Sequence, residues 1–461
     1  MGITAIVLAA GRSSRFGKSK LHLGFDGKLL AAHVLEKLGG QGFDKILLVS
    51  GDPEILEIGE SCGAVCITHT ENLLGQSASI RAGVQAAAQD SDYMFFVCDQ
   101  PLLRRESIAA LLSCRERHPG KVVLPTFGGT DGNPVIFPAA YRPALLGLSG
   151  DQGGRAALTG TADAVYCHFG DADEGRDIDT PRDFRSLLVR ASRLVVVRGG
   201  GDIATGVVQK LWRGGFKPVV LESSAPTAIR RSVALCEAVY EGHAQVEDLQ
   251  ARLVRDVPEI ARCHAQGVIP VLVDEEAGLV SRIGPVAVVD AIIAKRNLGT
   301  QRGMAPVTIG LGPGFTAGVD VDVVVETKRG HNLGCLIYEG TALPNTGTPG
   351  EIGGHSHLRV IHSPTGGRIT GVRNIGEVVS YGDTIAYIGN VPVTAPIDGL
   401  LRGLIRDSLL VRKGQKIADI DPREGEFRNW RTISDKARSV GGAVLEALIY
   451  ELHKRRQEGD V

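Results

Sequence analysis

The sequence predicts an α/β protein in three parts: two α/β domains built on parallel sheets, then a β-rich part. At 461 residues, the chain is about three times the usual ~150-residue domain, so several cores are expected. Short apolar runs alternate with helical periodicity from residue 3 to about 188, and the rhythm restarts at Arg193 and continues to about Ala294. From Val307, short β-like runs with frequent Gly and Pro take over. We therefore expect domains at 1–191, 192–305 and 306–461.

The first part alternates expected strands with expected helices. Helices are predicted over Leu29–Leu38, closed by Gly39 and Gly40, and over Ser77–Ala88, where Ser77 can cap the first turn. Apolar runs predict strands at Ile3–Leu8, Lys45–Val49, Val65–Thr68, Tyr93–Val97, Val122–Leu124 and Val135–Phe137. Helices are thus expected to cover a parallel sheet.

The rest of the chain gives a second α/β start and a repeat. A strand at Arg193–Arg198 is followed by a glycine cluster, a helix over Ile203–Trp212 and a strand at Pro218–Glu222. Two units of the form V-x-x-G-[DQ]-x-I-A-x-I, Val379–Ile388 and Val411–Ile420, predict a small pseudo-symmetric barrel. A last helix is expected from about Ala443 to Arg455.

Composition excludes several classes of protein. The 43% hydrophobic and 22% charged residues are typical of a soluble globular chain. Because 51 basic and 52 acidic residues nearly cancel, we expect no nucleic-acid partner and no membrane binding. No apolar run reaches the ~18 residues of a spanning helix. The eight Cys form no C-x-x-C pair, and the first residues lack the basic flank of a signal peptide, so a cytoplasmic protein is predicted.

The loop after the first strand is the first candidate site. Leu8, Ala9, Ala10 and Gly11 lead into a Gly/Ser-rich turn whose N–H groups can face phosphate oxygens. Two cations of this turn, Arg15 and Lys20, can supply charge toward the β- and γ-phosphates of a nucleotide. The spacing does not fit G-x-x-x-x-G-K-[ST], so this is no Walker loop. The alternative is a solvated basic turn.

Two aspartates are candidate metal ligands. Asp99 follows the buried run Tyr93–Cys98, and Asp179 lies in the segment Asp177–Asp183. Mg²⁺ needs only one or two protein carboxylates when phosphate and water complete its shell. Each Asp alone would more often be a cap or turn residue, and Thr180-Pro181 is typical of a helix start.

These residues resemble the nucleotidyltransferase family that includes molybdenum cofactor cytidylyltransferases, molybdopterin guanylyltransferases and sugar-nucleotide pyrophosphorylases. The resemblance covers about 1–190 and implies an N-terminal Rossmann-like nucleotidyltransferase domain in which Asp99 and Asp179 hold Mg²⁺. Guanylyl relatives have Gly-Gly where this chain has Ala9-Ala10-Gly11, so the extra Cβ of Ala10 narrows the space for a purine and favours CTP. Ser79 lies in a loop, Gly75–Ser79, that is expected at the base edge. The ordered motifs are LAAGRSSRFGKSK, GQSAS, CDQP, NPVIF, GDQGGR and DIDTPRDF.

A second glycine loop opens the second α/β part. Gly199, Gly201 and Ala204 satisfy G-x-G-x-x-[GA] between an expected strand and helix, and Glu222 ends the next strand. The pattern predicts a Rossmann-like domain with a dinucleotide, its pyrophosphate at Gly201 and a ribose on Glu222. The alternative is a structural β-α-β unit that binds no dinucleotide.

From Arg193 to Gly442 the chain resembles the accessory proteins of selenium-dependent molybdenum hydroxylase maturation. The resembling stretches are VVVRGGGDIATG, IGLGPGF, VVVET, GHNLG and PNTG. Cys236 and Cys335 are candidate sulfur or selenium handlers, although a free Cys is most often simply buried; His355 and His357 lack an evident third metal ligand. The repeat resembles a biotinyl- or lipoyl-type barrel-sandwich, but no Lys lies between Lys328 and Lys413 to carry a cofactor.

The leading hypothesis is an enzyme that transfers CMP from CTP to a molybdopterin-type molybdenum cofactor with release of pyrophosphate. Its expected partners are this cofactor as acceptor and a molybdenum hydroxylase apoenzyme. One alternative is guanylyl or sugar-phosphate transfer. The other is a cofactor-handling chaperone without turnover.

Overall fold

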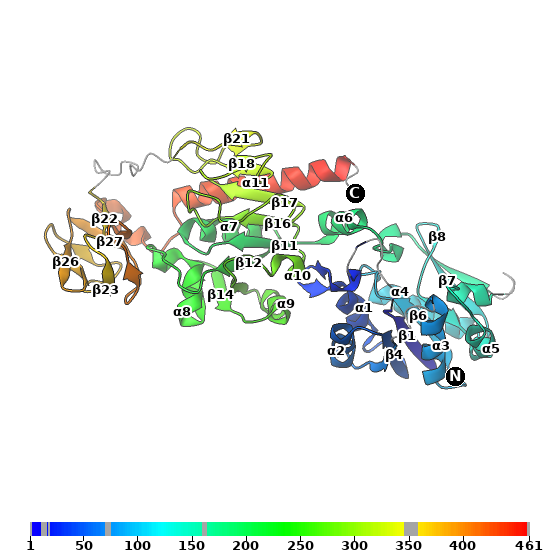
Figure 1. Cartoon of the computed structure of the whole chain (residues 1–461). Coiled ribbons are helices and arrows are strands. Elements are labelled where there is room, and N and C mark those ends of the chain that lie inside the picture. The colour runs from blue at the N-terminus through cyan, green and yellow to red at the C-terminus, as the bar shows by residue number, and fades with distance from the viewer. Residues whose placement is uncertain are drawn as a thin grey trace. The chain divides into compact units, whose positions relative to one another are not determined.

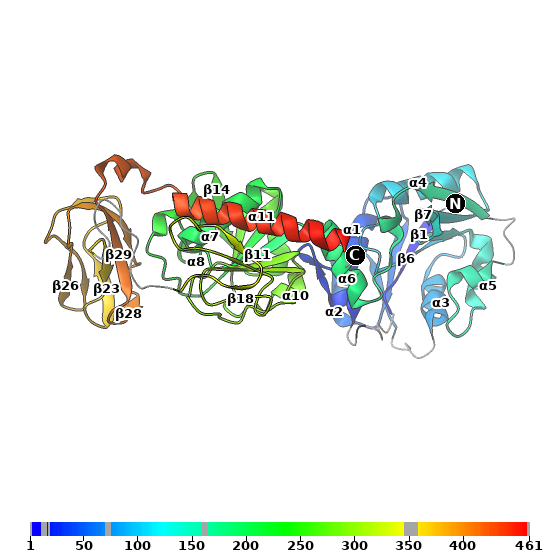
Figure 2. The ribbon, with the colours of Figure 1, turned by 90° about the horizontal axis from the view of Figure 1, so that it is seen from above.

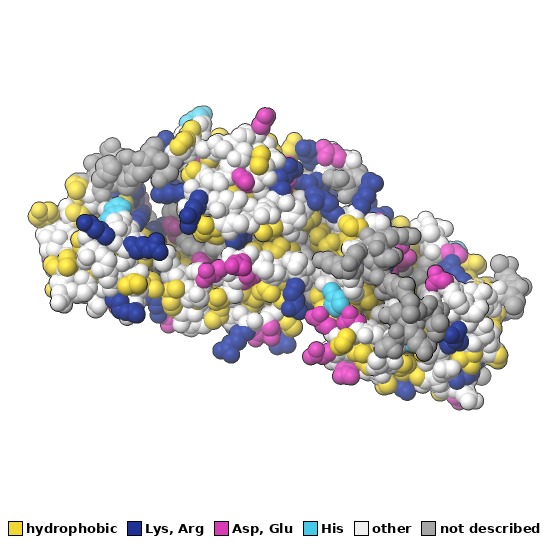
Figure 3. Space-filling view, in the orientation of Figure 1, with side chains coloured by type: hydrophobic (Ala, Val, Ile, Leu, Met, Phe, Trp, Pro, Cys, Tyr) yellow, Lys and Arg dark blue, Asp and Glu magenta, His cyan; other side chains and the backbone are white. Residues whose placement is uncertain are grey.

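The structure, a computed structural model, describes residues 2–10, 16, 19–69, 75–158, 164–344 and 358–458. It forms two compact units, Met1–Leu187 and Leu188–Val461 (Figure 1). The boundary falls within helix α6 (Pro181–Ala191), four residues before the division that we expected at 191/192. Basic and acidic side chains of the described residues both lie on the face shown in Figure 3.

The N-terminal unit is built on a mixed sheet with the strand order β10-β7-β9-β6-β1-β4-β5, and β8 pairs with β7. Strand β1 lies parallel to β4 and β6, and β9 is antiparallel to its neighbours. The strands are β1 (Ile3–Leu8), β4 (Lys45–Ser50), β5 (Val65–Thr68), β6 (Asp92–Val97), β7 (Val122–Phe127), β8 (Thr130–Asp131), β9 (Val135–Phe137) and β10 (Ala164–Phe169), with a hairpin of β2 (Gly24–Phe25) and β3 (Lys28–Leu29) outside the sheet. These bounds confirm the α/β prediction.

Helices cover both faces of this sheet. Alternation along β1 sends Ala5 and Val7 into one core, with residues of α1, α2 and α4, and Ile6 into the other, with residues of α3 and α5. The helices are α1 (Leu30–Leu38), α2 (Pro53–Ser61), α3 (Gln76–Ala86), α4 (Arg105–Arg117) and α5 (Arg142–Leu146), with 3-10 turns η1 (Lys20–His22), η3 (Ala139–Tyr141), η4 (Gly154–Ala157) and η6 (Ala172–Gly175).

The expected cap of α3 is wrong. The N-cap is Gly75, and the Ser77 hydroxyl donates to the carbonyl oxygen of Gly150 at 2.7 Å instead of capping the helix. Gly75 has φ +80°, and a Cβ there would lie 2.3 Å from the same carbonyl oxygen. The loop that contains Gly150 lies close to the start of α3, so the Ser77 hydroxyl bonds to that loop and does not cap the helix.

The C-terminal unit contains a nine-stranded sheet, ordered β13-β14-β15-β12-β11-β16-β17-β19-β20. Its central strands are parallel, and the two edge strands are antiparallel. The strands are β11 (Leu194–Arg198), β12 (Lys217–Glu222), β13 (His243–Val246), β14 (Leu249–Leu253), β15 (Ile269–Val273), β16 (Ala287–Asp290), β17 (Val307–Leu311), β19 (Val323–Val325) and β20 (Leu336–Ile337), with a separate pair β18 (Thr316–Ala317) and β21 (Gly340–Thr341). The sheet continues past the domain boundary that we expected at 305/306, because the fully buried strand β17 pairs with β16.

The last helix, α11 (Asp435–Gln457), packs on α7 (Asp202–Arg213) in this unit (Figures 1 and 2). The two helices meet at glycines: a Cβ on Gly206 would lie 2.5 Å from the carbonyl oxygen of Ala437, and one on Gly441 would lie 2.5 Å from that of Gly206. The helix begins eight residues before the expected Ala443, and Ser434 caps it through the N–H of Ala437. Shorter elements are α8 (Ala238–Glu241), α9 (Val257–Ala265), α10 (Val280–Ile283), η7 (Arg231–Val233), η8 (Leu235–Glu237) and η9 (Glu424–Asn429).

The repeat forms the expected barrel-like sandwich of two four-stranded sheets, β22-β29-β27-β24 and β26-β25-β23-β28. Each repeat unit places its long strand, β25 or β29, in one sheet and its short strand, β24 or β28, in the other. The strands are β22 (Val360–His362), β23 (Gly367–Gly371), β24 (Val378–Val379), β25 (Thr384–Ile388), β26 (Val391–Thr394), β27 (Gly399–Leu404), β28 (Leu410–Val411) and β29 (Lys416–Asp421). Within the described ranges, no helix has the length and apolar character to cross a bilayer.

Candidate active site

The candidate site lies at the carboxyl ends of β1 and β6, in the centre of the N-terminal sheet. The chain leaves β1 for β4 on one side and later returns as β6 on the other, which makes this the switch point where open α/β sheets bind ligands. Ala9 donates to the Val49 carbonyl oxygen at 2.9 Å, which fixes the start of the loop beside β4. Gly11 and Arg15 lie outside the described residues.

Lys20 joins the two expected metal ligands. Its Nζ lies 2.6 Å from Oδ2 of Asp99 and 2.8 Å from Oδ1 of Asp179. Lys20 and Asp99 are largely buried, whereas Asp179 is half-exposed. Three residues that the sequence places in separate motifs therefore form one cluster.

A backbone hydrogen bond and a side-chain hydrogen bond join the two aspartate segments. Ile178 N–H donates to the Asp99 carbonyl oxygen at 3.1 Å, and the Gln100 amide donates to Oδ1 of Asp177 at 2.9 Å. At the start of α6, Asp183 accepts from the Thr180 N–H at 2.8 Å and its own N–H donates to the Thr180 hydroxyl at 3.2 Å, a reciprocal cap at the place where the Thr-Pro pair predicts a helix start. The motif DIDTP thus docks on CDQP through its own backbone.

The charges of the cluster are strongly coupled. Burial disfavours the ammonium of Lys20, but Asp99 and Asp179 outweigh this effect and raise its pKa. Burial and the neighbouring Asp99 raise the pKa of Asp177 to about 6, although Gln100 donates to it. The sequence prediction missed Asp177 as a member of the site; its position two residues before Asp179, in the same motif, was the available signal.

The carboxylates fit a divalent cation. Oδ1 of Asp99 is buried and has no hydrogen-bond partner among the described residues, and such an atom is costly unless a ligand occupies it. The described residues contain no group of three metal-ligating side chains. A cation held by Asp99 and Asp179 would therefore take its other ligands from phosphate and water, as Mg²⁺ commonly does.

The other expected nucleotide contacts are less directly placed. Ala10 follows β1 and is half-buried, and Leu8 ends the strand. Ser79 is buried in α3 with 6% exposure, and α3 packs against β1 and β4. A contact of Ser79 or Ala10 with a base stays a prediction.

The second glycine loop follows β11 as expected and leads into α7. Gly199 has φ +92°, and a Cβ on Gly200 would lie 2.9 Å from the backbone nitrogen of Cys236, whereas one on Gly201 would meet nothing within 4 Å. Ala204 is fully buried, which agrees with its expected role in helix packing. The loop is closed on the Gly200 side and open on the Gly201 side.

The Glu222 carboxylate faces this loop, but it already accepts hydrogen bonds from backbone N–H groups. Its Oε1 accepts from Gly200 N–H at 3.1 Å and its Oε2 from Ser223 N–H at 2.6 Å. A ribose contact would compete with these two bonds. The dinucleotide stays a prediction.

The candidate cysteines differ in environment. Cys236 is buried, and burial together with Glu222, Glu237 and Asp202 raises the pKa of its thiol well above the ordinary value, which disfavours the nucleophilic thiolate. Cys335 is exposed. His355 and His357 lie outside the described residues.

Comparison with known families decides the class of the N-terminal part. Residues 5–165 match the family described as MobA-like NTP transferase domain. The N-terminal part is such a domain. This finding confirms the predicted nucleotidyltransferase domain.

Relatives match different stretches of the chain. "Uncharacterized protein YqeB" of Escherichia coli is 50% identical over 262 residues, 57% of this chain, and the chain spans only 48% of that protein. The purine catabolism protein PucB of Bacillus subtilis is 29% identical over 195 residues, 40% of this chain and 94% of PucB. A solved nucleotidyl transferase from Methanothermobacter is 21% identical with a TM-score of 0.36, over 40% of this chain and 95% of its own. The YqeB match is longer than the N-terminal unit, so it includes part of the C-terminal unit.

Proposed function

We propose that the N-terminal unit transfers CMP from CTP to a molybdopterin-type molybdenum cofactor and releases pyrophosphate. The observation that carries this proposal is the cluster of Lys20, Asp99 and Asp179 at the switch point of a MobA-like NTP transferase domain. The buried, unpartnered Oδ1 of Asp99 supports a divalent cation there.

In the proposed reaction, a phosphate oxygen of the pterin attacks the α-phosphorus of CTP. The bond between that phosphorus and the bridging oxygen breaks, and pyrophosphate leaves with the electron pair. Lys20 is held charged by two carboxylates, so it can stabilise negative charge on the leaving phosphates, with Arg15 as the second cation. When bound at Asp99 and Asp179, Mg²⁺ would neutralise charge on the triphosphate. Within the expected stretch Leu8 to Gly11, the N–H groups of Ala10 and Gly11 would face the phosphates, because the Ala9 N–H already donates to Val49.

Base choice is proposed to depend on Ala10, because its methyl group narrows the space for a purine, and on polar groups near Ser79. The acceptor is proposed to be a pterin because the domain is MobA-like. If Ala10 does not limit the pocket, guanylyl or sugar-phosphate transfer is the alternative.

The C-terminal unit is proposed to be a maturation module that delivers the finished cofactor to a molybdenum hydroxylase apoenzyme. The support is the sequence resemblance of this half to hydroxylase accessory proteins. A cofactor-handling chaperone without turnover is the second candidate, and it differs from the first by releasing no pyrophosphate.

The test is a pyrophosphate-release assay with full-length protein, purified molybdopterin cofactor, Mg²⁺ and each of the four nucleoside triphosphates. We expect release with CTP, and loss of release in Lys20→Met. Lys45→Met is the matched control, because Lys45 is exposed at the start of β4. Release with GTP alone would reject the cytidylyl assignment, and no release with any nucleotide would favour the chaperone.

A further inference from the structure

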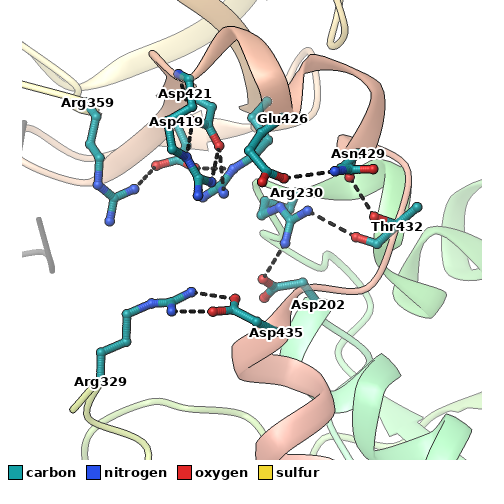
Figure 4. Close-up of polar contacts among 12 residues, drawn as sticks. Asp202, Arg230, Arg329, Arg359, Asp419, Asp421, Glu426, Asn429, Thr432 and Asp435 are labelled. Atoms are coloured by element: carbon teal, nitrogen blue, oxygen red, sulfur yellow. Dashed lines mark hydrogen bonds and ion pairs between the residues drawn. The ribbon is translucent and has the colours of Figure 1, made fainter. Parts of the chain in front are cut away.

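The C-terminal unit gathers cations beside the open end of its glycine loop. Arg230 precedes η7, Lys436 lies in the first turn of α11, and Arg359, Arg402 and Lys416 belong to the barrel. Figure 4 shows the guanidinium groups of Arg230, Arg329 and Arg359 around one space between the barrel and the α/β sheet. Segments some 200 positions apart in the chain meet here, as the bond from Arg230 to the Thr432 carbonyl oxygen shows.

Arg230 is as buried as Arg359, and both of its polar contacts are long. It is 9% exposed, Nη1 lies 3.5 Å from Oδ2 of Asp202, and Nη2 donates to Thr432 at 3.3 Å. Its Nε is buried and has no partner among the described residues. Burial lowers the pKa of this guanidinium, and Asp202 only partly offsets the effect. A buried guanidinium with long contacts and an unused donor is costly unless an acceptor fills the site.

The carboxylates nearby are shared among several cations. On the barrel side, Asp419 is fully buried; it pairs with Arg359 at 2.9 Å, with Lys416 at 3.9 Å and also with Arg402. On the sheet side, Asp202 acts on both Arg230 and Lys436, and burial lowers the pKa of the Lys436 ammonium. Thus Asp202 and Asp419 each act on several of the five cations, while Arg402 also contacts Asp421 at 3.4 Å and Glu326 also acts on Lys436.

The remaining charges near this space are satisfied locally. Arg329 binds Asp435 through two bonds of 2.6 and 2.7 Å, and Arg423 binds Asp421 through bonds of 2.9 and 2.8 Å. The carboxylate oxygens of Glu326 accept from backbone N–H groups. Among the described residues, five cations therefore lie around Asp202 and Asp419, and the buried Glu326 also acts on one of them, Lys436.

The start of α7 adds donors to the same place. Gly201 is the N-cap, and no side chain caps this helix; the N–H groups of a first turn lack helical partners. Asp202, the first helical residue, is the one that contacts Arg230. Among the described residues, a Cβ on Gly201 would meet no atom within 4 Å, which leaves room for a ligand against the backbone.

We propose that Arg230, Lys436, Lys416 and the first turn of α7 bind a small phosphate-bearing anion with at least two negative charges. A helix N-terminus with an arginine fork beside it is suited to phosphate oxygens. A nucleic-acid backbone is excluded as the ligand because Arg230 is 9% exposed. This site needs no ribose on Glu222, and it does not rest on nucleotide transfer by the N-terminal unit.

The experiment is calorimetric titration of full-length protein with inorganic phosphate and with pyrophosphate at constant ionic strength. All proteins carry Lys20→Met, so that anion binding in the N-terminal unit is weakened equally. We expect saturable binding that Arg230→Gln weakens at least ~10-fold, equivalent to ~1.4 kcal/mol. Arg213→Gln is the control at the other end of α7, since Arg213 is half-exposed and pairs with Asp248. Equal affinities in these two variants would overturn the proposal.

A second variant keeps the test valid if Arg230→Gln unfolds. Gly201→Ala adds a methyl group in open space at φ −68°, so the ligand-free protein should fold and melt like its parent. We expect the methyl group to weaken phosphate binding, because it enters the space of the ligand. Parental affinity in folded Gly201→Ala would also overturn the proposal.

Parallel titrations with CTP and NAD⁺ identify the source of the phosphate. Tighter binding of either, lost in Arg230→Gln, supports the site with a nucleotide as its natural ligand. Binding of NAD⁺ alone, unchanged in Arg230→Gln and lost in Glu222→Gln, would replace this site with the dinucleotide mode.

Discussion

The two glycine-containing loops of this chain occupy equivalent places in two sheets and have opposite surroundings. Each follows a buried central strand, β1 or β11, at the carboxyl edge of a parallel array. The first meets the carboxylates Asp99, Asp177 and Asp179 with Lys20 among them. The second meets the cations Arg230 and Lys436, which share Asp202. A glycine loop after a central strand is thus proposed to bind a metal-bound nucleotide in the N-terminal unit and an anion without a metal in the C-terminal unit.

The carboxylates beside the first loop are expected to affect catalysis most strongly. We expect Asp99→Asn to reduce pyrophosphate release by at least ~100-fold, because losing charge stabilisation at a transferring phosphoryl group costs ~3 kcal/mol or more. Asp179→Asn should act in the same direction. The measurement is kcat with CTP, and Asp90→Asn, in the exposed turn before β6, is the control. Turnover of Asp99→Asn at the level of the control would remove Asp99 from the site.

Independence of the two units can be tested where α7 crosses α11. Gly206→Ala should destabilise the C-terminal unit by ~1–3 kcal/mol, because its Cβ would lie 2.5 Å from a backbone oxygen of Ala437. Gly442→Ala, in the facing helix α11 and with no described atom within 4 Å of its Cβ, should be neutral or stabilising by up to ~1 kcal/mol. Thermal unfolding separates the two, and pyrophosphate release should be unchanged in both. Loss of release in Gly206→Ala alone would show that the units act together.

The preference for CTP over GTP tests the role of Ala10 in the first loop. Ala10→Gly should lower the preference for CTP over GTP by roughly 10- to 100-fold, since steric discrimination is worth ~1–3 kcal/mol. The change should come from better use of GTP. The measurement is kcat/KM for both nucleotides in wild type and variant. Equal use of CTP and GTP by the wild type would reject the cytidylyl assignment.

The smallest expected effect concerns a charge pair beside the second loop. Two hydrogen bonds from Arg329 lower the pKa of Asp435 to about 2, below its ordinary 3.8. The stabilisation is therefore complete above pH ~4 and disappears as the pH falls through about 2. Because Asp435 is 71% exposed, Asp435→Asn should cost less than ~1 kcal/mol at pH 7. Urea unfolding at pH 7 and pH 3 should show a smaller difference at the lower pH, and a larger one would contradict the assignment.

Most strands could be predicted because burial leaves a local pattern. Runs such as Ile3–Leu8 are apolar at every position but Thr4, since parallel strands are covered on both faces. The glycine loops and Asp99 follow such runs directly, so their place at a sheet edge was predictable. The β-like runs from Val307 were also predictable from the sequence. Their membership in the nine-stranded sheet was not, because an apolar pattern does not indicate which strand pairs with which.

The sequence by itself determined the α/β class, the repeat that forms the barrel and the residue types at the first site. Only the tertiary structure decided that Lys20 lies between Asp99 and Asp179, that Asp177 joins them and that Glu222 binds its own loop. It alone brought Arg230 beside α11 and the barrel. The physical reason is that burial and periodicity are local properties, whereas hydrogen bonds and charge sharing depend on strand order and on segments distant in the chain.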